Sequence, residues 1–498
     1  MAILWSAVPN DSPLTEPQQR ALAELLRLAP VASELGERFH AAGHRLALVG
    51  GSVRDALLGR LGQDLDFTTD ARPDQIMAVV KPWADAVWDV GIDFGTVGAR
   101  KDGYRLEITT YRSEAYDRTS RKPVVVYGHS LTGDLKRRDF TVNAMAIEMP
   151  YLRFVDPYHG LRDLSRKILR TPATPQESFS DDPLRMMRAA RFAAQLRFAV
   201  APEVAAAIAQ MTDRIEIVSA ERIRDELVRL VNSADPRAGL TLLVDTGLAD
   251  RVLPELPRLR LEIDEHHRHK DVYEHTLTVV EQAIALEDDG PDFVLRMAAL
   301  MHDVGKPKTR RFDPDGGVSF HHHEAVGAKL TRARMRALKF DKQTTDDVCR
   351  LVELHLRFHG YGTGEWTDSA VRRYVRDAGP LLDRLNKLTR ADCTTRNRRK
   401  AEALWRSYGQ LERRIAALQA KEQLDAIRPD IDGNEIMRVL GIKQGPVVGR
   451  AYKHMLELRL DRGPVDHDTA VADLLAWWSE QPESAATQTA GPHPMNGG

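Results

Sequence analysis

The sequence predicts an α/β domain at the N-terminal end of the chain, followed by a mostly α-helical remainder. Short β-like runs separated by Gly- and Asp-rich turns occupy the region before residue 171. From Asp181 onward, segments rich in Ala, Leu and Arg show helical spacing and are interrupted by Pro and Gly. With 498 residues, of which 43% are hydrophobic and 29% charged, the chain has the length and composition of several globular domains.

The change of pattern along the chain predicts six segments. A Pro-containing lead-in precedes the α/β domain, and the last stretch is small, polar and Pro/Gly-containing, which is typical of disorder. The expected segments are a lead-in over 1–30, the α/β domain over 31–171, a helical neck over 172–235, a helical body over 236–400, a helical tail over 401–482 and a disordered C-terminus over 483–498.

Overall composition excludes several classes of protein. The net charge is only -1, so any RNA site must come from a local asymmetry of charge. Cys349 and Cys393 are too few for a disulfide framework or a thiolate zinc site, which fits a reducing compartment. The N-terminus lacks the basic and apolar regions of a signal peptide, and no apolar run is long enough to span a bilayer. We therefore expect a cytoplasmic protein without membrane contact; the sequence does not indicate its oligomeric state.

The first β-like run, Arg45–Val49, leads directly into Gly50 and Gly51. Two glycines after a strand let the backbone approach a phosphate closely, and the amide groups at the start of a following helix can bind it. Arg54 would lie within reach of the same anion. A Gly-Gly pair alone, however, is more often an ordinary turn.

Two acidic residues, Asp64 and Asp66, follow on the next β-like run, Leu65–Thr68. Residues two apart on a strand leave the same face, with Cα atoms roughly 6.5–7 Å apart. Two such carboxylates repel each other unless a cation lies between them. We expect Mg²⁺ there, because it prefers oxygen ligands and triphosphate oxygens complete its shell. Taken alone, an Asp-x-Asp pair is more often a solvated strand edge.

In this order and at this separation, the glycine turn and the carboxylate pair resemble the signature of the DNA-polymerase-β-like nucleotidyltransferases. The match is close to the class II tRNA CCA-adding enzymes and bacterial poly(A) polymerases. The resemblance implies a palm-like mixed sheet of about five strands, then a helical neck, body and tail. It also continues through further β-like runs at Tyr104–Tyr111 and Val124–Tyr127 and through residues 134–146, DLKRRDFTVNAMA.

The resemblance assigns roles to residues in these segments. Glu107 would be the third catalytic acid, although a solvent-facing strand Glu remains an alternative. Arg138 would meet the triphosphate, while Asp139 and Asn143 would order the ribose. The alternative for this block is an Arg/Asp cap on a helix. Residues 219–227 resemble the family's next motif, a helix start with Ser219 as its N-cap and a structural role.

Residues 181–192 are predicted to form a helix on which Asp182, Arg185, Arg188 and Arg191 make a slowly winding stripe. Cytosine and adenine both present an amino donor beside a ring-nitrogen acceptor, whereas uracil and guanine present the reverse. Asp182 as acceptor and Arg185 as donor can therefore select C and A; Arg188 and Arg191 would lie nearer the phosphates. The alternative is ion pairing on a solvated helix. The family usually has Glu at Asp181, a position outside the base-reading pair.

A second set of candidate ligands, His275, His302, Asp303 and Asp392, resembles the HD metal-dependent phosphohydrolase pattern. His323 and His355 fall where some HD proteins add ligands. Imidazole and carboxylate together suit a transition-metal ion, which we expect here without expecting phosphatase or phosphodiesterase activity. The alternative is that the histidine runs are exposed polar segments.

The resemblance as a whole implies addition of C, C and A from CTP and ATP to the 3′ end of tRNA, with Mg²⁺ on Asp64 and Asp66. Alternatives are a poly(A) polymerase, an HD phosphohydrolase with an inactive polymerase domain, or a non-catalytic RNA-binding protein. The helical tail would bind tRNA. Basic residues that could contact tRNA phosphates, or be merely solvated, are Arg372, Arg373, Arg376, Arg396, Arg398, Arg399 and Lys400.

Overall fold

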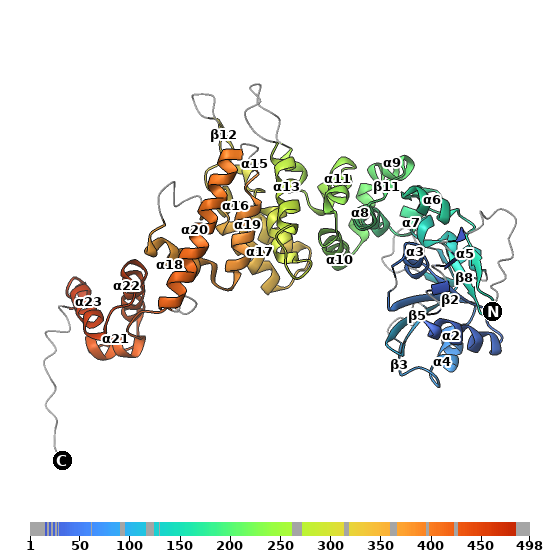
Figure 1. Cartoon of the computed structure of the whole chain (residues 1–498), viewed down its shortest axis with the longest axis horizontal. Coiled ribbons are helices and arrows are strands. Elements are labelled where there is room, and N and C mark those ends of the chain that lie inside the picture. Colours follow the sequence, from blue (N-terminus) through green and yellow to red (C-terminus); the bar gives the residue numbers. More distant parts are fainter. Residues whose placement is uncertain are drawn as a thin grey trace, which may run out of the picture. The chain divides into compact units, whose positions relative to one another are not determined.

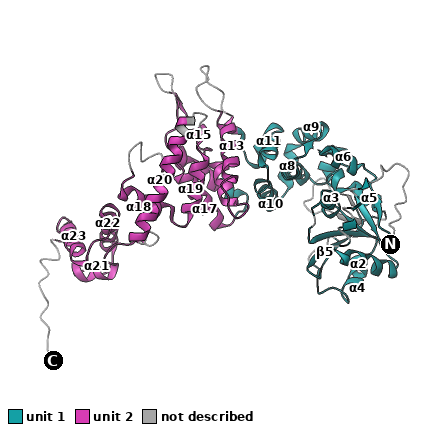
Figure 2. Ribbon diagram, viewed as in Figure 1, with its two compact units in different colours: residues 1–257, 334–340 teal, residues 258–333, 341–498 magenta. Residues whose placement is uncertain are grey.

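The computed structural model describes residues 15–484 apart from short gaps. The gaps are 17–18, 21–22, 25–26, 28, 61, 90–94, 116–123, 129, 261–270, 313–317, 359–365, 395–397 and 423–426. Most of the expected lead-in and the expected disordered C-terminus lie outside the described residues. The chain divides into two compact units, residues 1–257 with 334–340 and residues 258–333 with 341–498 (Figure 2). The finer domain bounds stay predictions.

Unit 1 contains a seven-stranded mixed sheet, where about five strands were expected. The strand order is β3-β4-β5-β2-β1-β8-β9, and neighbours are antiparallel except β2 and β5, which are parallel. The strands are β1 (Leu46–Val49), β2 (Asp64–Thr69), β3 (Ala86–Trp88), β4 (Thr96–Lys101), β5 (Tyr104–Thr110), β8 (Ala146–Met149) and β9 (Arg153–Val155).

The predicted strand at Val124–Tyr127 exists but lies outside the main sheet. It is β7, and it pairs with β6 (Arg112–Ala115) in a separate two-stranded sheet. Two further short pairs are parallel β10 (Ile168–Leu169) with β11 (Ala199–Val200) and antiparallel β12 (Arg311–Phe312) with β13 (Val318–Ser319). The sequence pattern therefore located β7 correctly, but not its partner strand.

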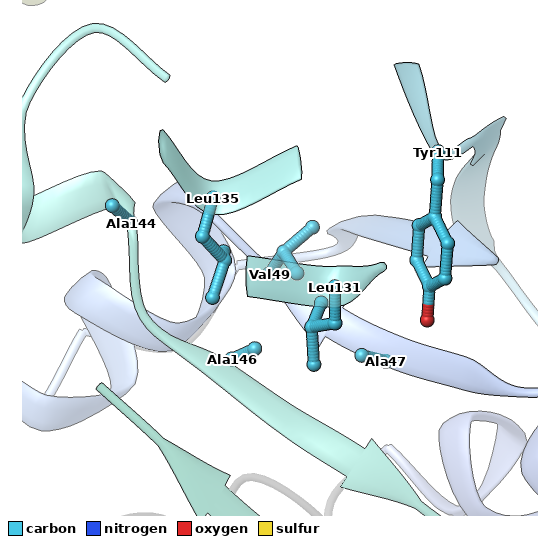
Figure 3. Packing of buried hydrophobic residues seen from close by; sticks show 7 residues of the cluster. All are labelled: Ala47, Val49, Tyr111, Leu131, Leu135, Ala144 and Ala146. Carbon is cyan, nitrogen blue, oxygen red and sulfur yellow. The ribbon is translucent and has the colours of Figure 1, made fainter. Parts of the chain in front are cut away.

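The central strand β1 is buried along its whole length. Ala47 and Val49 pack on one face against Leu131 and Leu135 of α5 (Leu131–Lys136), together with Tyr111, Ala144 and Ala146 (Figure 3). On the other face, α2 (Pro30–Ala41) approaches β8 so closely that a Cβ atom at Gly36 would lie 2.5 Å from Cβ of Met149. Helices α2 and α5 thus both pack against β1, and Figure 1 shows these two helices on opposite sides of the sheet.

The other helices of the N-terminal half follow the expected change to helical structure. They are α3 (Gly51–Leu57), α4 (Pro73–Val80), α6 (Gly160–Arg166), α7 (Pro175–Asp181), α8 (Leu184–Leu196), α9 (Pro202–Gln210), α10 (Ala220–Val231), α11 (Pro236–Asp245) and α12 (Ala249–Val252). The single helix predicted over residues 181–192 was wrong at its start. Asp182 is extended, with φ -145° and ψ 100°, because the residue before Pro183 is disfavoured in a helix.

The C-terminal half is helical as predicted. Its helices are α13 (Val272–Ile284), α14 (Phe293–Met301), α15 (Lys306–Thr309), α16 (His323–Ala337), α17 (Lys342–Leu354), α18 (Asp368–Ala378), α19 (Leu382–Ala391), α20 (Arg398–Glu422), α21 (Gly433–Leu440), α22 (Pro446–Arg462) and α23 (His467–Ser479). The last three share a small hydrophobic core that includes Ile436, Met455 and Leu474. Among the described residues, no helix combines the length and apolar character needed to cross a membrane.

Candidate active site

Three acidic side chains gather on neighbouring strands of the main sheet. The parallel register of β2 and β5 sets Asp66 directly beside Glu107. Asp64 lies two residues before Asp66 on β2, so both carboxylates leave the same face of the strand. Asp64 is exposed and Asp66 is partly buried. The structure therefore brings together the three acidic residues that the sequence singled out.

The Gly50 turn lies against the same carboxylates. Gly50 has φ 72° and ψ -133°, a backbone conformation that residues with a side chain rarely adopt. A Cβ atom at this position would lie 2.9 Å from Nη1 of Arg138 and 3.7 Å from Oδ2 of Asp66. The turn, the Arg138 guanidinium and the Asp66 carboxylate consequently share one small space. Gly51 begins α3 directly after the turn.

Ser52, a residue that the sequence did not single out, fixes the carboxylate strand to α3. Its hydroxyl donates to the backbone carbonyl of Asp64 at 3.2 Å and accepts from the backbone N–H of Asp66 at 3.2 Å. The two bonds hold the peptide groups on either side of Leu65. No property of Ser52 other than its place after the two glycines could have indicated this contact.

The surroundings of Asp66 disfavour its ionised form. Burial raises the pKa of Asp66, and the carboxylates of Glu107 and Asp64 raise it further. The guanidinium groups of Arg138 and Arg54 lower it without reversing the shift. A divalent cation bound by oxygen ligands would offset the mutual repulsion of these carboxylates, so the residues present fit such an ion.

Arg138 donates a hydrogen bond to Asp134, while its Nε donor has no partner among the described residues. Its Nη2 donates to Oδ2 of Asp134 at 3.3 Å. Its Nε is buried and has no hydrogen-bond partner among the described residues. Burial would raise the pKa of Asp134, but the charges of Arg138 and Arg137 hold it below its usual value. Nη1 of Arg138 is the guanidinium atom that lies against Gly50, so this end of the side chain can meet an anion at the turn.

A continuous chain of hydrogen bonds connects Arg54 on α3 with Arg188 on α8. Arg54 Nη1 donates to Oδ1 of Asn143 at 2.5 Å, and Nδ2 of Asn143 donates to Oδ1 of Asp139 at 2.9 Å. Arg188 donates to Oδ2 of Asp139 through Nε at 2.9 Å and Nη2 at 2.6 Å. Burial would raise the pKa of Asp139, but Arg188 and Asn143 hold it well below its usual range.

Glu226 on α10 extends this chain and was not predicted as a site residue. It is buried, and its Oε2 accepts from Nε of Arg191 at 2.6 Å. Its Oε1 accepts from Nη1 of Arg188 at 3.5 Å. The only signal for Glu226 was its position in the helix start at 219–227, where Ser219 does cap α10 by accepting from the backbone N–H of Arg222 at 3.4 Å.

The predicted base-reading pair lies at the junction of α7 and α8. Asp182 accepts from the backbone N–H of Leu184 at 3.1 Å and from Nη2 of Arg222 at 2.9 Å. Arg185 is buried; it donates through Nη1 to the Ser178 hydroxyl at 2.9 Å and through Nη2 to the carbonyl of Arg137. Both side chains therefore have protein partners of their own, and each retains hydrogen-bonding capacity for a base.

The candidate ligands of the HD pattern converge in unit 2. His302 and Asp303 are buried, and His302 Nε2 lies 3.2 Å from Asp303 Oδ2. His275 Nε2 lies 2.9 Å from Asp392 Oδ1. Two groups of residues each bring three ligand atoms within 4.8 Å of one another. The groups are His275, His302 and Asp392, and Asp303, His323 and His355.

Burial and the positive charge of His302 lower the pKa of His355 to about 4, so His355 is neutral near pH 7. Burial would also lower the pKa of His302, but Asp303 raises it above its usual value. The buried histidines of this cluster therefore differ in their readiness to accept a proton, and the alternative of an exposed polar run does not hold for them.

Three of the predicted RNA-contact arginines are engaged within the chain. Arg372 is buried and donates from Nε and Nη2 to Glu422, at 2.8 Å each. Arg373 pairs with Glu457 at 2.6 Å and Asp461 at 2.9 Å, and Arg376 lies 3.9 Å from Glu457. Arg399 is exposed. Arg396 and the side chains of Arg398 and Lys400 lie outside the described residues.

Comparison with known proteins assigns the chain. Residues 46–170 match the family model described as the poly A polymerase head domain, 197–259 the probable RNA and SrmB-binding site of polymerase A, and 272–397 the HD domain. An A-adding tRNA nucleotidyltransferase of Deinococcus radiodurans is 34% identical over 446 residues, which cover 88% of this chain and 96% of that protein. The chain belongs to the tRNA nucleotidyltransferase family.

Other members of the tRNA nucleotidyltransferase family agree with this assignment. A CC-adding tRNA nucleotidyltransferase of Thermus thermophilus is 31% identical over 453 residues, covering 89% of this chain and 96% of that protein. The solved CCA-adding enzyme of Bacillus stearothermophilus in complex with CTP shares the fold, with a TM-score of 0.63 and 24% identity over 96% of this chain and 100% of that one. The predicted family and fold class are thus confirmed, and the chain is a nucleotidyltransferase.

Proposed function

We propose that this nucleotidyltransferase adds C, C and A to the 3′ end of tRNA, using CTP and ATP and releasing pyrophosphate. The observation that carries the proposal is the cluster of Asp64, Asp66 and Glu107 at the Gly50 turn, with Arg138 beside it. The names of the relatives support tRNA as the acceptor.

The carboxylates of Asp64 and Asp66 would hold Mg²⁺, with Glu107 as the third acid. An ion held there would supply the charge that lowers the pKa of the attacking hydroxyl and stabilises the leaving pyrophosphate. Arg138 would bind the triphosphate through the guanidinium that lies against Gly50. A residue with a side chain at position 50 would fill this space, so the glycine keeps it open for phosphate oxygens.

The remaining predicted residues would orient the nucleotide. Asp139 and Asn143, held between Arg54 and Arg188, would order the ribose, since their hydrogen bonds fix both side chains. Asp182 and Arg185 would read the base from the junction of α7 and α8. Arg191, held by Glu226, would support Arg188 near the phosphates.

Two relatives that match over 96% of their own length are named differently: that of Deinococcus radiodurans is A-adding and that of Thermus thermophilus is CC-adding. A CCA-adding enzyme of Levilactobacillus brevis matches over a shorter segment, with 42% identity over 208 residues, 42% of this chain and 51% of that protein. These names favour a tRNA 3′-end reaction. Complete CCA addition is the form that a base-reading pair accepting both C and A supports.

The test uses three tRNA transcripts that end before CCA, after the first C and after the second C, each with a single nucleotide. We expect C on the first two and A on the third, with neither U nor G added. A addition alone would indicate an A-adding enzyme, C addition alone a CC-adding enzyme, and unlimited A without C a poly(A) polymerase. Asp66→Asn should give no product, whereas the matched surface change Asp74→Asn should extend normally.

The location and partners follow from this function. tRNA, CTP and ATP are the partners that the reaction requires, and a cytoplasmic location would supply all three. The chain has only two cysteines, Cys349 and Cys393, too few for a disulfide framework, which supports a reducing compartment.

A further inference from the structure

Unit 1 contains a cavity of about 490 Å³ at the start of β1. Leu46 and Met149, which are buried and pair across β1 and β8, form its apolar wall. The other residues that line it are His40, His44, Arg45, Glu148, Tyr151 and Arg153. A volume of about 300–1,000 Å³ with an apolar wall and a few polar side chains is typical of a small-molecule site.

The cavity lies at the opposite end of β2 from the acidic cluster. Strands β1 and β2 are antiparallel, and Leu46 at the cavity pairs with Thr69, the last residue of β2. Asp64 is the first residue of β2, whose six residues extend roughly 17 Å. A ligand in the cavity would therefore occupy a place distinct from the nucleotidyl-transfer site.

Two rings form an aromatic corner at this cavity. The hydroxyl of Tyr151 and Nε2 of His40 lie within hydrogen-bond distance, at 3.3 Å. The ring centroids are 5.5 Å apart and the ring planes meet at 75°, so the two rings pack edge to face. Tyr151 is 66% exposed. Its ring thus has a fixed neighbour and an accessible surface on which the planar ring of a ligand can stack.

The charged side chains of the cavity leave one cation for an anionic ligand. Arg153 pairs with Glu148, so these two charges offset each other. Arg45 is exposed and makes no ion pair with any described residue. Its backbone N–H, not its side chain, donates to Oδ1 of Asp70 at 2.8 Å, and the same oxygen lies 3.5 Å from Nδ1 of His44. The Arg45 guanidinium can therefore bind phosphate oxygens.

We propose that this cavity binds a free mononucleotide, whose base stacks on Tyr151 and whose phosphate pairs with Arg45. A strand of RNA is bound along a groove with several cations. Here two arginines line the cavity, and within the described residues only Arg45 lacks an ion-pair partner. One aromatic platform and one available cation match a single nucleotide. The site is additional to the nucleotidyl-transfer site and does not depend on the proposed function.

Equilibrium dialysis of the full-length chain with radiolabelled AMP tests the proposal. Arg45→Ala removes a charged hydrogen-bond donor and should weaken AMP binding at this site by roughly 10- to 150-fold. At the AMP concentration that just saturates the wild-type chain, this variant should bind one AMP fewer. Arg166→Ala, at another exposed arginine of unit 1, is the matched control and should bind as much as wild type.

The difference in bound AMP between wild type and Arg45→Ala does not depend on whether the nucleotidyl-transfer site also takes AMP. A failure of this proposal is thus distinguishable from a failure of the proposed function. Circular dichroism establishes that each variant is folded. Equal binding by wild type, Arg45→Ala and the control would overturn the proposal, and so would an equal loss in the control.

Photocrosslinking with 8-azido-AMP locates the bound nucleotide. Trypsin cleaves after Arg38 and Arg45, so the peptide 39–45 reports on the cavity alone. We expect label on this peptide that AMP blocks, that adenosine blocks far less, and that Tyr151→Ala reduces; Tyr452→Ala, at an exposed tyrosine of unit 2, should keep it. Label confined to other peptides, or blocked equally by adenosine, would contradict the proposal. Label blocked by a tRNA transcript but not by AMP would assign the cavity to RNA and likewise overturn it.

Discussion

Replacing Asp182 with asparagine tests how this enzyme would select its nucleotides. The two carboxylate oxygens of Asp182 accept from the Leu184 backbone N–H at 3.1 Å and from Arg222 at 2.9 Å. An asparagine amide has only one oxygen, so its NH₂ group must face one of these donors. If the oxygen stays on Leu184, the NH₂ group faces Arg222 and the amino group of an incoming C or A.

The expected loss follows from one unpaired polar group, which costs ~1–3 kcal/mol. In kcat/KM this corresponds to a roughly 5- to 150-fold loss of the preference for CTP over UTP. The assay compares the two nucleotides on a tRNA transcript that lacks CCA. The neighbouring Asp181→Asn serves as the matched control and should keep the wild-type preference. An unchanged preference in Asp182→Asn, or an equal loss in the control, would refute the assignment of base reading to Asp182.

Three further predictions concern stability and the glycine turn. Glu226→Gln removes the buried charge that holds Arg188 and Arg191. The free energy of unfolding should fall by about 3–5 kcal/mol, and the midpoint temperature of the first unfolding transition in calorimetry by roughly 6–20 °C. An unchanged midpoint temperature would contradict this prediction. The pKa of Asp66 is raised in the folded state, so its ionisation destabilises the metal-free fold at neutral pH. In chelator at pH 7, Asp66→Asn should therefore have a higher melting temperature than wild type. This difference in melting temperature should shrink as the pH falls through the folded-state pKa of Asp66. Gly50 has φ 72°, so Gly50→Ala should introduce backbone strain of order 1–3 kcal/mol and reduce the extension of tRNA. Full extension of tRNA by this variant would show that the turn tolerates a side chain.

The sequence could predict the fold where hydrophobic runs and turns alternate clearly. Arg45–Val49, Leu65–Thr68 and Tyr104–Tyr111 correspond to β1, β2 and β5, and the acidic cluster lies on β2 and β5. Strands β3, β4, β8 and β9 of the same sheet were not predicted, because none of them is a long run of alternating apolar and polar residues. Pairing between distant strands, as in β1 with β8, depends on tertiary packing that local patterns do not contain.

For the site, spacing along a strand predicted that Asp64 and Asp66 share a face, and the family resemblance supplied Glu107 as their neighbour. Spacing along a helix was less reliable, since Pro183 separates Asp182 from α8. The contacts of Ser52 and Glu226 join segments distant in sequence, so no local pattern could indicate them.

Extension of tRNA by Asp64→Asn is the most direct measurement of whether the acidic cluster performs nucleotidyl transfer. Radiolabelled CTP and ATP are supplied with Mg²⁺ and a transcript lacking CCA, and His302→Ala is assayed in parallel. The account predicts no extension by Asp64→Asn and wild-type extension by His302→Ala, with both variants folded. Extension that persists in Asp64→Asn would contradict it.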